Sequence, residues 1–278
     1  MKYALPLFIS LCAINSFAVD VAPSAVCNAV LSLKNLVLKS GRSCDNLTAK
    51  LLNQYVNQLS FISDSAKVCG RNQAVVAQIL KITGQKSCAD VTPVDLAKIF
   101  EFYVEGTGPK PVKSIRNLAL GDLKGLFNAT SVVFEYTYLE TVEPGAFSDL
   151  KSVSNIELSH TRISYLRPDT FCKNGVYGLP SLKTMDLDSN RPFKGGTIET
   201  NLLSCLSNLE DIDFDTDELT HFTEGTFAGN KKLKKMDLKN NPGMSTSEIN
   251  YIKSLGIIPE IGTDKDDIME AWQIPDSI

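Results

Sequence analysis

Hydrophobic and polar positions between residues 129 and 241 repeat in a fixed frame. The frame places apolar residues at its first, fourth and sixth positions, and Asn, Thr or Asp at its ninth. Copies begin 24, 29, 27 and 24 residues apart, at Ala129, Val153, Leu182, Leu209 and Leu233. Such repetition predicts a solenoid with one short strand per copy, because no single copy can bury its apolar side alone.

The strand of each copy is expected to turn alternate side chains to opposite sides. In NLEDIDFDTDEL, residues 208–219, Ile212 and Phe214 would then face the core while acids point outwards. The central outward column contains Val133, Glu157, Asp186, Asp213 and Asp237. The column after it contains Glu135, Ser159, Asp188, Asp215 and Lys239, and the one before it Ser131, Asn155, Thr184, Asp211 and Lys235. Strands lie ~4.8 Å apart, so facing like charges cost about 1 kcal/mol per pair in water.

Residues 112–243 resemble the leucine-rich repeat family, in particular its secreted form with 24-residue repeats. The resemblance rests on the frame, on its five registered copies and on the phenylalanines that close three of the copies, Phe147, Phe171 and Phe227. The resemblance implies a parallel sheet on a concave face. The chain departs from the family in the asparagine column, which holds Thr137, Thr161, Asn190, Asp217 and Asn241, and in RPFKGGTIETNLLSC, which interrupts the third copy.

The concave sheet is the surface that this family generally uses for recognition, so the resemblance implies a partner-binding face. Its candidate residues are Val133, Glu135, Tyr136, Glu157, Asp186, Asp188, Asp211, Asp213, Asp215 and Asp237. Such an acidic face suits a protein or another macromolecule with a basic patch. Two alternatives stay open: a solvated face whose charges prevent aggregation, and a calcium site, although the spacing fits no loop-type calcium motif.

Two similar segments precede the repeats, beginning at Val26 and Val68. Each contains Val-Cys, an apolar-periodic stretch, a Gly, Ser-Cys and a second periodic stretch, which predicts two helical hairpins in residues 19–104. Gly84 is expected at a helix end, and Thr92-Pro93-x-Asp95 at a helix start. The predicted fold class is α+β: this disulfide-stapled bundle, a Gly/Pro-rich linker at 105–112, the repeats at 113–244, and a C-terminal cap with an acidic tail at 245–278.

Residues 1–18, MKYALPLFISLCAINSFA, have the pattern of a secretory signal peptide. Export to the periplasm or the extracellular space favours disulfides between the six remaining cysteines. Duplication favours Cys27–Cys44 and Cys69–Cys88, although four cysteines allow three pairings. Cys172 and Cys205 lie near the same point of adjacent copies, which predicts a third bond. No later segment approaches the roughly 18 apolar residues of a membrane span.

The last coil is expected to be covered by a helix in STSEINYIKSLG, capped by Ser245 or Ser247 and ended by Gly256. The tail that follows carries Trp272, either as a packed extension of this cap or as an exposed interaction peptide. Asn46 and Asn128 begin glycosylation sequons, which matter only in a eukaryotic host.

The leading functional hypothesis is a secreted, non-enzymatic protein-binding module without cofactor or metal. A net charge of −4 argues against a nucleic-acid partner, and closely spaced Cys or His pairs of a zinc site are missing from the sequence. A structural or adhesive surface protein is the alternative. A glycan hydrolase with paired carboxylates is less favoured, because no pocket that would raise a pKa is evident and the familiar catalytic motifs do not occur.

Overall fold

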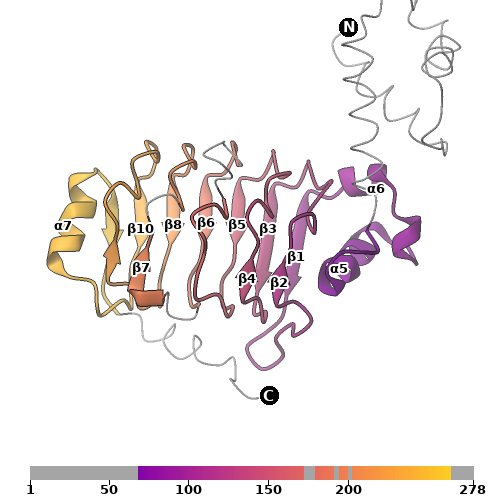
Figure 1. Cartoon of the computed structure of the whole chain (residues 1–278), viewed down its shortest axis with the longest axis horizontal. Helices are drawn as coiled ribbons and strands as arrows, with labels where there is room; N and C mark the ends of the chain where they lie inside the picture. Colours follow the sequence, from indigo (N-terminus) through magenta and orange to yellow (C-terminus); the bar gives the residue numbers. More distant parts are fainter. Residues whose placement is uncertain (1–67, 172–178, 191–193, 200–201, 264–278) are drawn as a thin grey trace, which may run out of the picture. The chain divides into compact units, whose positions relative to one another are not determined.

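The computed structural model describes residues 68–171, 179–190, 194–199 and 202–263 (Figure 1). The signal segment, the first duplicated segment with its expected Cys27–Cys44 bond, and the Trp272 tail lie outside the described residues. Contacts divide the chain after Ala66, so the second duplicated segment shares a compact unit with the repeats.

A seven-stranded parallel sheet runs the length of this unit. Its order is β1 (Glu101–Glu105), β3 (Ser131–Glu135), β5 (Asn155–Glu157), β6 (Thr184–Asp186), β8 (Asp211–Asp213), β10 (Lys235–Asp237) and β11 (Ile258–Glu260). One strand comes from each coil, which confirms the strand positions that the frame predicts for the five copies.

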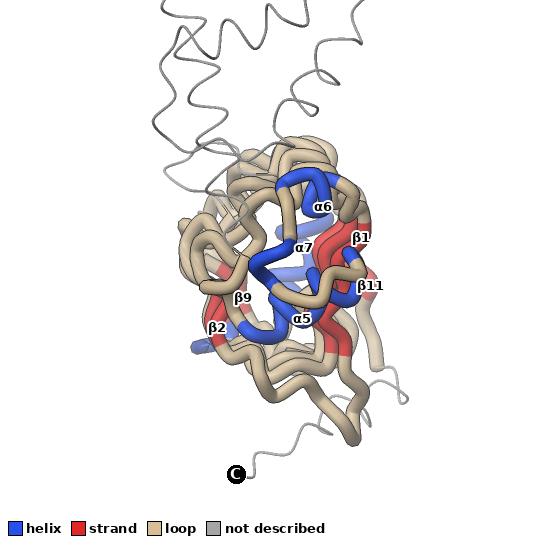
Figure 2. Tube along the Cα trace, turned by 90° about the vertical axis from the view of Figure 1, so that its right-hand side faces the viewer, coloured by secondary structure: helices blue, strands red, loops and turns tan. Residues whose placement is uncertain are grey.

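Short strands close the coils on the opposite side of the core. β2 (Asn117–Leu118) pairs with β4 (Thr141–Val142), and β7 (Thr197–Ile198) pairs with β9 (His221–Phe222). The view along the solenoid shows the main sheet on one side and β2 and β9 on the other, joined by loops (Figure 2). The apolar columns of the described coils therefore lie between the main sheet and the loops and short strands opposite it.

The core follows the predicted columns. Ile212 and Phe214 are fully buried, as are their equivalents Ile156 and Leu158 in another copy. Burial of each such side chain contributes about 1.5–3 kcal/mol relative to leaving it exposed. A ladder of polar side chains satisfies the buried backbone beside them: the Asn190 amide donates to the carbonyls of Leu158 and Leu187. The solenoid is thus stabilised by one apolar spine and one polar ladder.

The turn after each strand contains a non-glycine residue in the left-handed backbone region. The five residues directly precede the asparagine column and have φ between 46° and 56°: Tyr136, His160, Ser189, Thr216 and Asn240. Left-handed residues usually are Gly, Asn or Asp, so most of these turns carry strain. No feature of the sequence frame indicated this turn.

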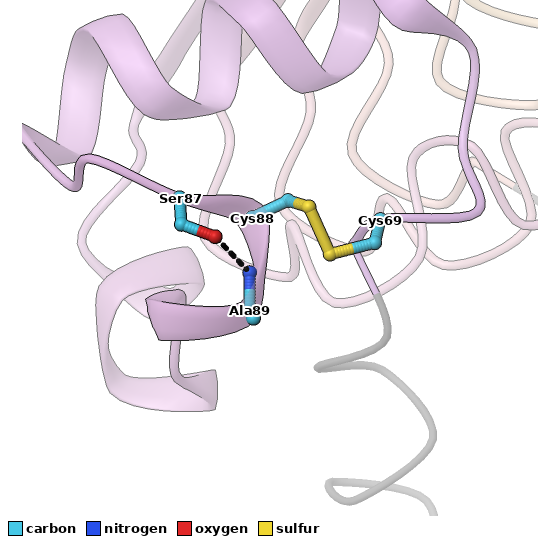
Figure 3. Close-up of a disulfide and its surroundings, with 4 residues drawn as sticks. All are labelled: Cys69, Ser87, Cys88 and Ala89. Carbon is cyan, nitrogen blue, oxygen red and sulfur yellow. Dashed lines mark hydrogen bonds between the residues drawn. A yellow bond between two sulfur atoms is a disulfide. The ribbon is translucent and has the colours of Figure 1, made fainter.

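The second duplicated segment forms an N-terminal cap against β1 (Figure 1). Helix α5 (Gln73–Thr83) ends at Gly84, whose φ is 70°, and α6 (Pro93–Ala97) begins with a capping box between Thr92 and Asp95, both as expected. The Cys69–Cys88 bond is present beside the 3-10 turn η3 (Cys88–Asp90), where the Ser87 hydroxyl accepts a hydrogen bond from the Ala89 N–H (Figure 3).

The prediction of a second helix in this segment is wrong beyond Ala97. Residues 101–105 form β1 instead, in register with β3. Phe102 and Val104 are buried while Glu101 and Glu105 are exposed, which is the alternation of a strand. Pairing with β3 protects the sheet edge and places Phe102 against Phe134, with ring centroids 6.2 Å apart.

The sheet therefore begins before residue 113, and the expected linker at 105–112 belongs to the first coil. The Gly106 N–H donates to the Glu135 carbonyl, and Val112 bridges to Thr137. A Cβ at position 106 would meet the Tyr136 carbonyl oxygen at 2.5 Å, so only glycine fits there.

A C-terminal cap closes the other end. Helix α7 (Thr246–Ser254) begins at Ser245, whose side chain accepts from the Glu248 N–H, and β11 extends the sheet beyond β10. Among the described residues, no helix has both the length and the apolar composition needed to cross a bilayer.

Candidate functional site

Carboxylates gather on the outer side of the main sheet, in what we call the acidic face: Glu157, Asp186, Asp188, Asp213, Asp215 and Asp237. The predicted central column is in register, since Val133 pairs with Glu157, Glu157 with Asp186, Asp186 with Asp213, and Asp213 with Asp237. Together with Glu135, Ser159, His160 and Lys239, the acidic face lines a polar hollow of about 290 Å³. Residues of five successive strands and of the turns after them thus line one hollow.

Burial and mutual repulsion change the acidity of this face. Burial, followed by the charge of Asp188, raises the pKa of Asp186 to about 8. Burial also raises the pKa of Asp188 and that of Asp213 to about 7, with further contributions from neighbouring carboxylates. At neutral pH these side chains therefore share protons, because full ionisation would leave desolvated like charges side by side.

The backbone fixes the orientation of three of these carboxylates in the same way. One oxygen of Asp186 accepts from the N–H of Asp188 at 3.0 Å, and Asp213 accepts from Asp215 at 2.8 Å. Asp237 accepts from the N–H of Lys239 at 2.9 Å. These three strands end in the same local turn, so the backbone holds the carboxyl groups in one orientation.

Basic side chains lie only at the margins of the acidic face within the described residues. The Lys239 ammonium contacts Asp237 at 2.6 Å, and its hydrogen bond to Asp237 raises the pKa of Lys239. His160 Nε2 lies 3.7 Å from Asp188. Asp186 and Asp213 form no ion pair in the described part of the chain. The carboxyl groups at the centre of the face therefore have no basic partner among the described residues, whereas Lys239 lies at one end of the face and His160 at the other.

Two candidate residues differ from their expected placement. Val133 is only 5% exposed, because β1 places Tyr103 beside it, so it offers little apolar surface. Asp215 is also 5% exposed, and its oxygens accept hydrogen bonds from the Thr216 hydroxyl and the Asn240 amide.

The remaining candidates lie where the frame puts them, at different distances from the hollow. Asp211 lies in the flanking column between Thr184 and Lys235, outside the hollow. Tyr136 is partly exposed and stacks on His160, with ring centroids 4.2 Å apart. The candidate residues predicted from the sequence do not include His160, although it occupies the same position of its copy as Tyr136.

The prediction of an acidic face without a pocket that raises a pKa is wrong. It placed the acids on an open, regular face, whereas the structure has a hollow in which three carboxyl groups have raised pKa values. The calcium alternative gains no support, because in the described ranges no group of three or more His, Cys, Asp or Glu residues is arranged to hold a metal ion.

Only one of the two cysteines in the expected Cys172–Cys205 bond lies among the described residues. Cys205 is disulfide-bonded, whereas Cys172 lies outside the described residues, so that pairing stays a prediction. Cys69 and Cys88, the other described cysteines, are bonded to each other.

Comparison with known proteins agrees with this geometry. Residues 128–191 match the family model "Leucine rich repeat". The chain contains leucine-rich repeats. We call the unit formed by its sheet and the two caps the leucine-rich repeat domain. No curated protein matches the sequence.

Solved structures similar to this chain include two internalins of Listeria monocytogenes. One, inlF, has a TM-score of 0.48 and 12% identity, over 73% of this chain and 54% of its own. The other, inlC2, has a TM-score of 0.40 and 19% identity, over 73% and 90%. The Toll–Spatzle complex of Drosophila gives a TM-score of 0.43 and 15% identity, over 53% of this chain and 18% of that chain. The chain thus spans about half the length of the inlF structure.

Proposed function

We propose that this chain is an exported recognition protein whose leucine-rich repeat domain binds a basic segment of a protein partner through the acidic face. The observation that carries the proposal is the pair Asp186 and Asp213. These residues are opposite each other on adjacent strands, have raised pKa values, and lack an ion-pair partner within the described residues. A lysine or arginine placed between them would offset both desolvation and repulsion.

A merely solubilising role explains this arrangement less well. Charges that keep a protein soluble act when they are exposed and hydrated. Those of the acidic face are partly buried around a hollow, where they destabilise the fold. Retaining carboxylates at a cost in stability is typical of a binding site.

Export is supported by the signal-like residues 1–18 and by the Cys69–Cys88 bond, since disulfides persist in oxidising compartments. The proposed partner therefore meets the protein in the periplasm or the extracellular space. A surface protein with a structural or adhesive role would need the same export and is distinguished by self-association.

The test uses a fluorescent lysine-rich decapeptide as the probe. In the double variant Asp186→Asn/Asp213→Asn we expect affinity for the probe to fall about 10-fold or more, equivalent to about 1.4 kcal/mol. The matched control, Asp90→Asn/Glu224→Gln, changes two exposed acids outside the acidic face and should bind as the wild type does. Equal binding by both double variants would eliminate the acidic face as the site.

A second candidate function is carboxylate-dependent glycan hydrolysis, favoured by the raised pKa of Asp186. A carboxyl group protonated near neutral pH can act as a general acid, and a neighbouring ionised Asp can act as a base. Incubation with a glycan panel tests this: turnover by the wild type that is lost in Asp186→Asn would support an enzyme. Absence of turnover at pH 5–8 would leave recognition alone.

A further inference from the structure

A second charged site lies away from the acidic face, around the ring of Tyr138. Three cations surround this ring: the Arg162 guanidinium carbon is 3.6 Å from the ring centroid, the Lys113 ammonium 5.4 Å and the Arg116 guanidinium carbon 5.5 Å. The aromatic face attracts cations, but it carries no net charge to balance them.

Successive coils bring these residues together. The Tyr138 N–H donates to the Val112 carbonyl at 3.0 Å, which places the ring beside Lys113. On the other side the Arg162 N–H donates to the Leu139 carbonyl at 2.9 Å. The stacking of the coils therefore fixes this arrangement, and it does not depend on one flexible loop.

Few anionic partners lie around the ring within the described residues. Glu140 pairs with Arg116 at 2.5 Å and with Arg162 at 4.0 Å, so one carboxylate serves two guanidinium groups. The Lys113 ammonium forms no ion pair and no hydrogen bond within the described residues, and its side chain is exposed. Lys113 is therefore the one cation of this cluster without an anionic partner among the described residues.

The Tyr138 side chain supplies a second, independent sign of a ligand. It is 1% exposed, and its hydroxyl makes no hydrogen bond within the described part of the chain. A buried hydroxyl without a partner costs stability, whereas an acceptor oxygen brought in by a ligand would satisfy it.

We propose that Lys113, Arg116 and Arg162 form a binding site for one oxyanion group, a phosphate or a sulfate. Guanidinium groups bind such tetrahedral anions through paired N–H donors, and an ammonium adds a compact charge. The oxyanion supplies a negative charge beside Lys113 and several acceptor oxygens. This site is separate from the acidic face, so its test and the test of the proposed function have independent outcomes.

The test titrates inorganic phosphate and phenyl phosphate into the full mature protein at constant ionic strength. The backbone amide signals of Tyr138 and Arg162 are followed by NMR. We expect saturable shifts, and affinity about 5-fold weaker in Lys113→Gln, since one exposed charge is lost. The matched control Lys231→Gln removes an exposed lysine in another part of the solenoid and should leave the titration unchanged.

Lys113 is the residue to change because it is exposed, whereas the side chain of Arg162 is only 9% exposed and its substitution endangers folding. Tighter binding of phenyl phosphate than of inorganic phosphate would support an ester carried by a larger ligand. Equal binding would support recognition of the free ion. Shifts that do not saturate, or that are the same in Lys113→Gln and Lys231→Gln, would overturn the site.

Discussion

Asp217 accepts a hydrogen bond from the backbone N–H of Asn190, 3.0 Å away, at the ladder position that is asparagine in the coils on either side. Asn190 and Asn241 also donate from their amide groups to backbone carbonyls, a bond that an ionised carboxylate cannot make. Asp217 is fully buried, and its second oxygen has no hydrogen-bond partner within the described residues. Burial, with a contribution from Asp188, raises its pKa well above the ordinary value.

The first prediction is that Asp217→Asn stabilises the protein at neutral pH by about 1–3 kcal/mol, the cost of an unsatisfied buried polar group. The gain should shrink below pH 4, where the unfolded chain also carries the proton. Urea unfolding at pH 7 and pH 3.5 measures both values. The reverse change in the next coil, Asn241→Asp, should destabilise. Equal stability of Asp217→Asn and the wild type at pH 7 would contradict this account of the ladder.

The acidic face predicts a characteristic dependence of stability on pH. In the folded protein the pKa of Asp186 is about 8 and those of Asp188 and Asp213 about 7, all above the ordinary value of 3.8. The unfolded chain releases these protons at lower pH than the folded chain does. Their contribution to the free energy of unfolding is therefore fully present below pH 3.8 and is lost as the pH rises to about 8.

The second prediction follows: Asp186→Asn/Asp213→Asn should raise Tm at pH 8 by several degrees and change it little at pH 3.5. Thermal unfolding of wild type and variant across this range measures the difference in Tm, in which the contributions of groups outside the acidic face cancel. The double variant Asp90→Asn/Glu224→Gln has the same net charge and should not reproduce the effect. An increase in Tm that is as large at pH 3.5 as at pH 8 would exclude proton release as the cause of the stabilisation.

The third prediction concerns the N-terminal cap. Cys69 and Cys88 are 19 residues apart, and closing a loop of that size stabilises by about 3 kcal/mol in the chain-entropy model. Cys69→Ser/Cys88→Ser should therefore lose about this free energy of unfolding, measured in urea. Cys88→Ser alone should lose a similar amount, because the bond is already broken. A loss below 0.5 kcal/mol would show that the helices hold the cap without the bond.

Much of the fold could be predicted because the frame occurs five times. Each copy fixes the phase of the next, so the register of Asp186, Asp213 and Asp237 could be deduced before any coordinates. In a short apolar run, the two-residue period of a strand is hard to distinguish from the 3.6-residue period of a helix. A helix is therefore expected where residues 101–105 form β1. Residues 101–105 form a strand because they pair with the edge of β3, a long-range contact that the local sequence does not indicate.

The electrostatics of the site could not be predicted in the same way. Column positions indicate which side of the sheet a residue is on, but they do not indicate how deeply its carboxyl group is buried. Asp213 and Asp215 lie close together at the end of one strand, yet Asp215 is nearly inaccessible and accepts hydrogen bonds from Thr216 and Asn240. Such bonds depend on the turn after each strand.

That turn gives the fourth prediction. Thr216 has φ 56°, in the left-handed region, where a β-branched residue is unfavourable; Asn240 occupies the same turn one coil later with φ 52°. Asparagine tolerates this conformation, so Thr216→Asn should stabilise by about 0.5–1 kcal/mol, at the low end of the strain that such residues store. Asn240→Thr should destabilise by a similar amount. Urea unfolding of both variants measures the pair, and changes of the same sign would show that side-chain contacts, and not backbone strain, decide the preference.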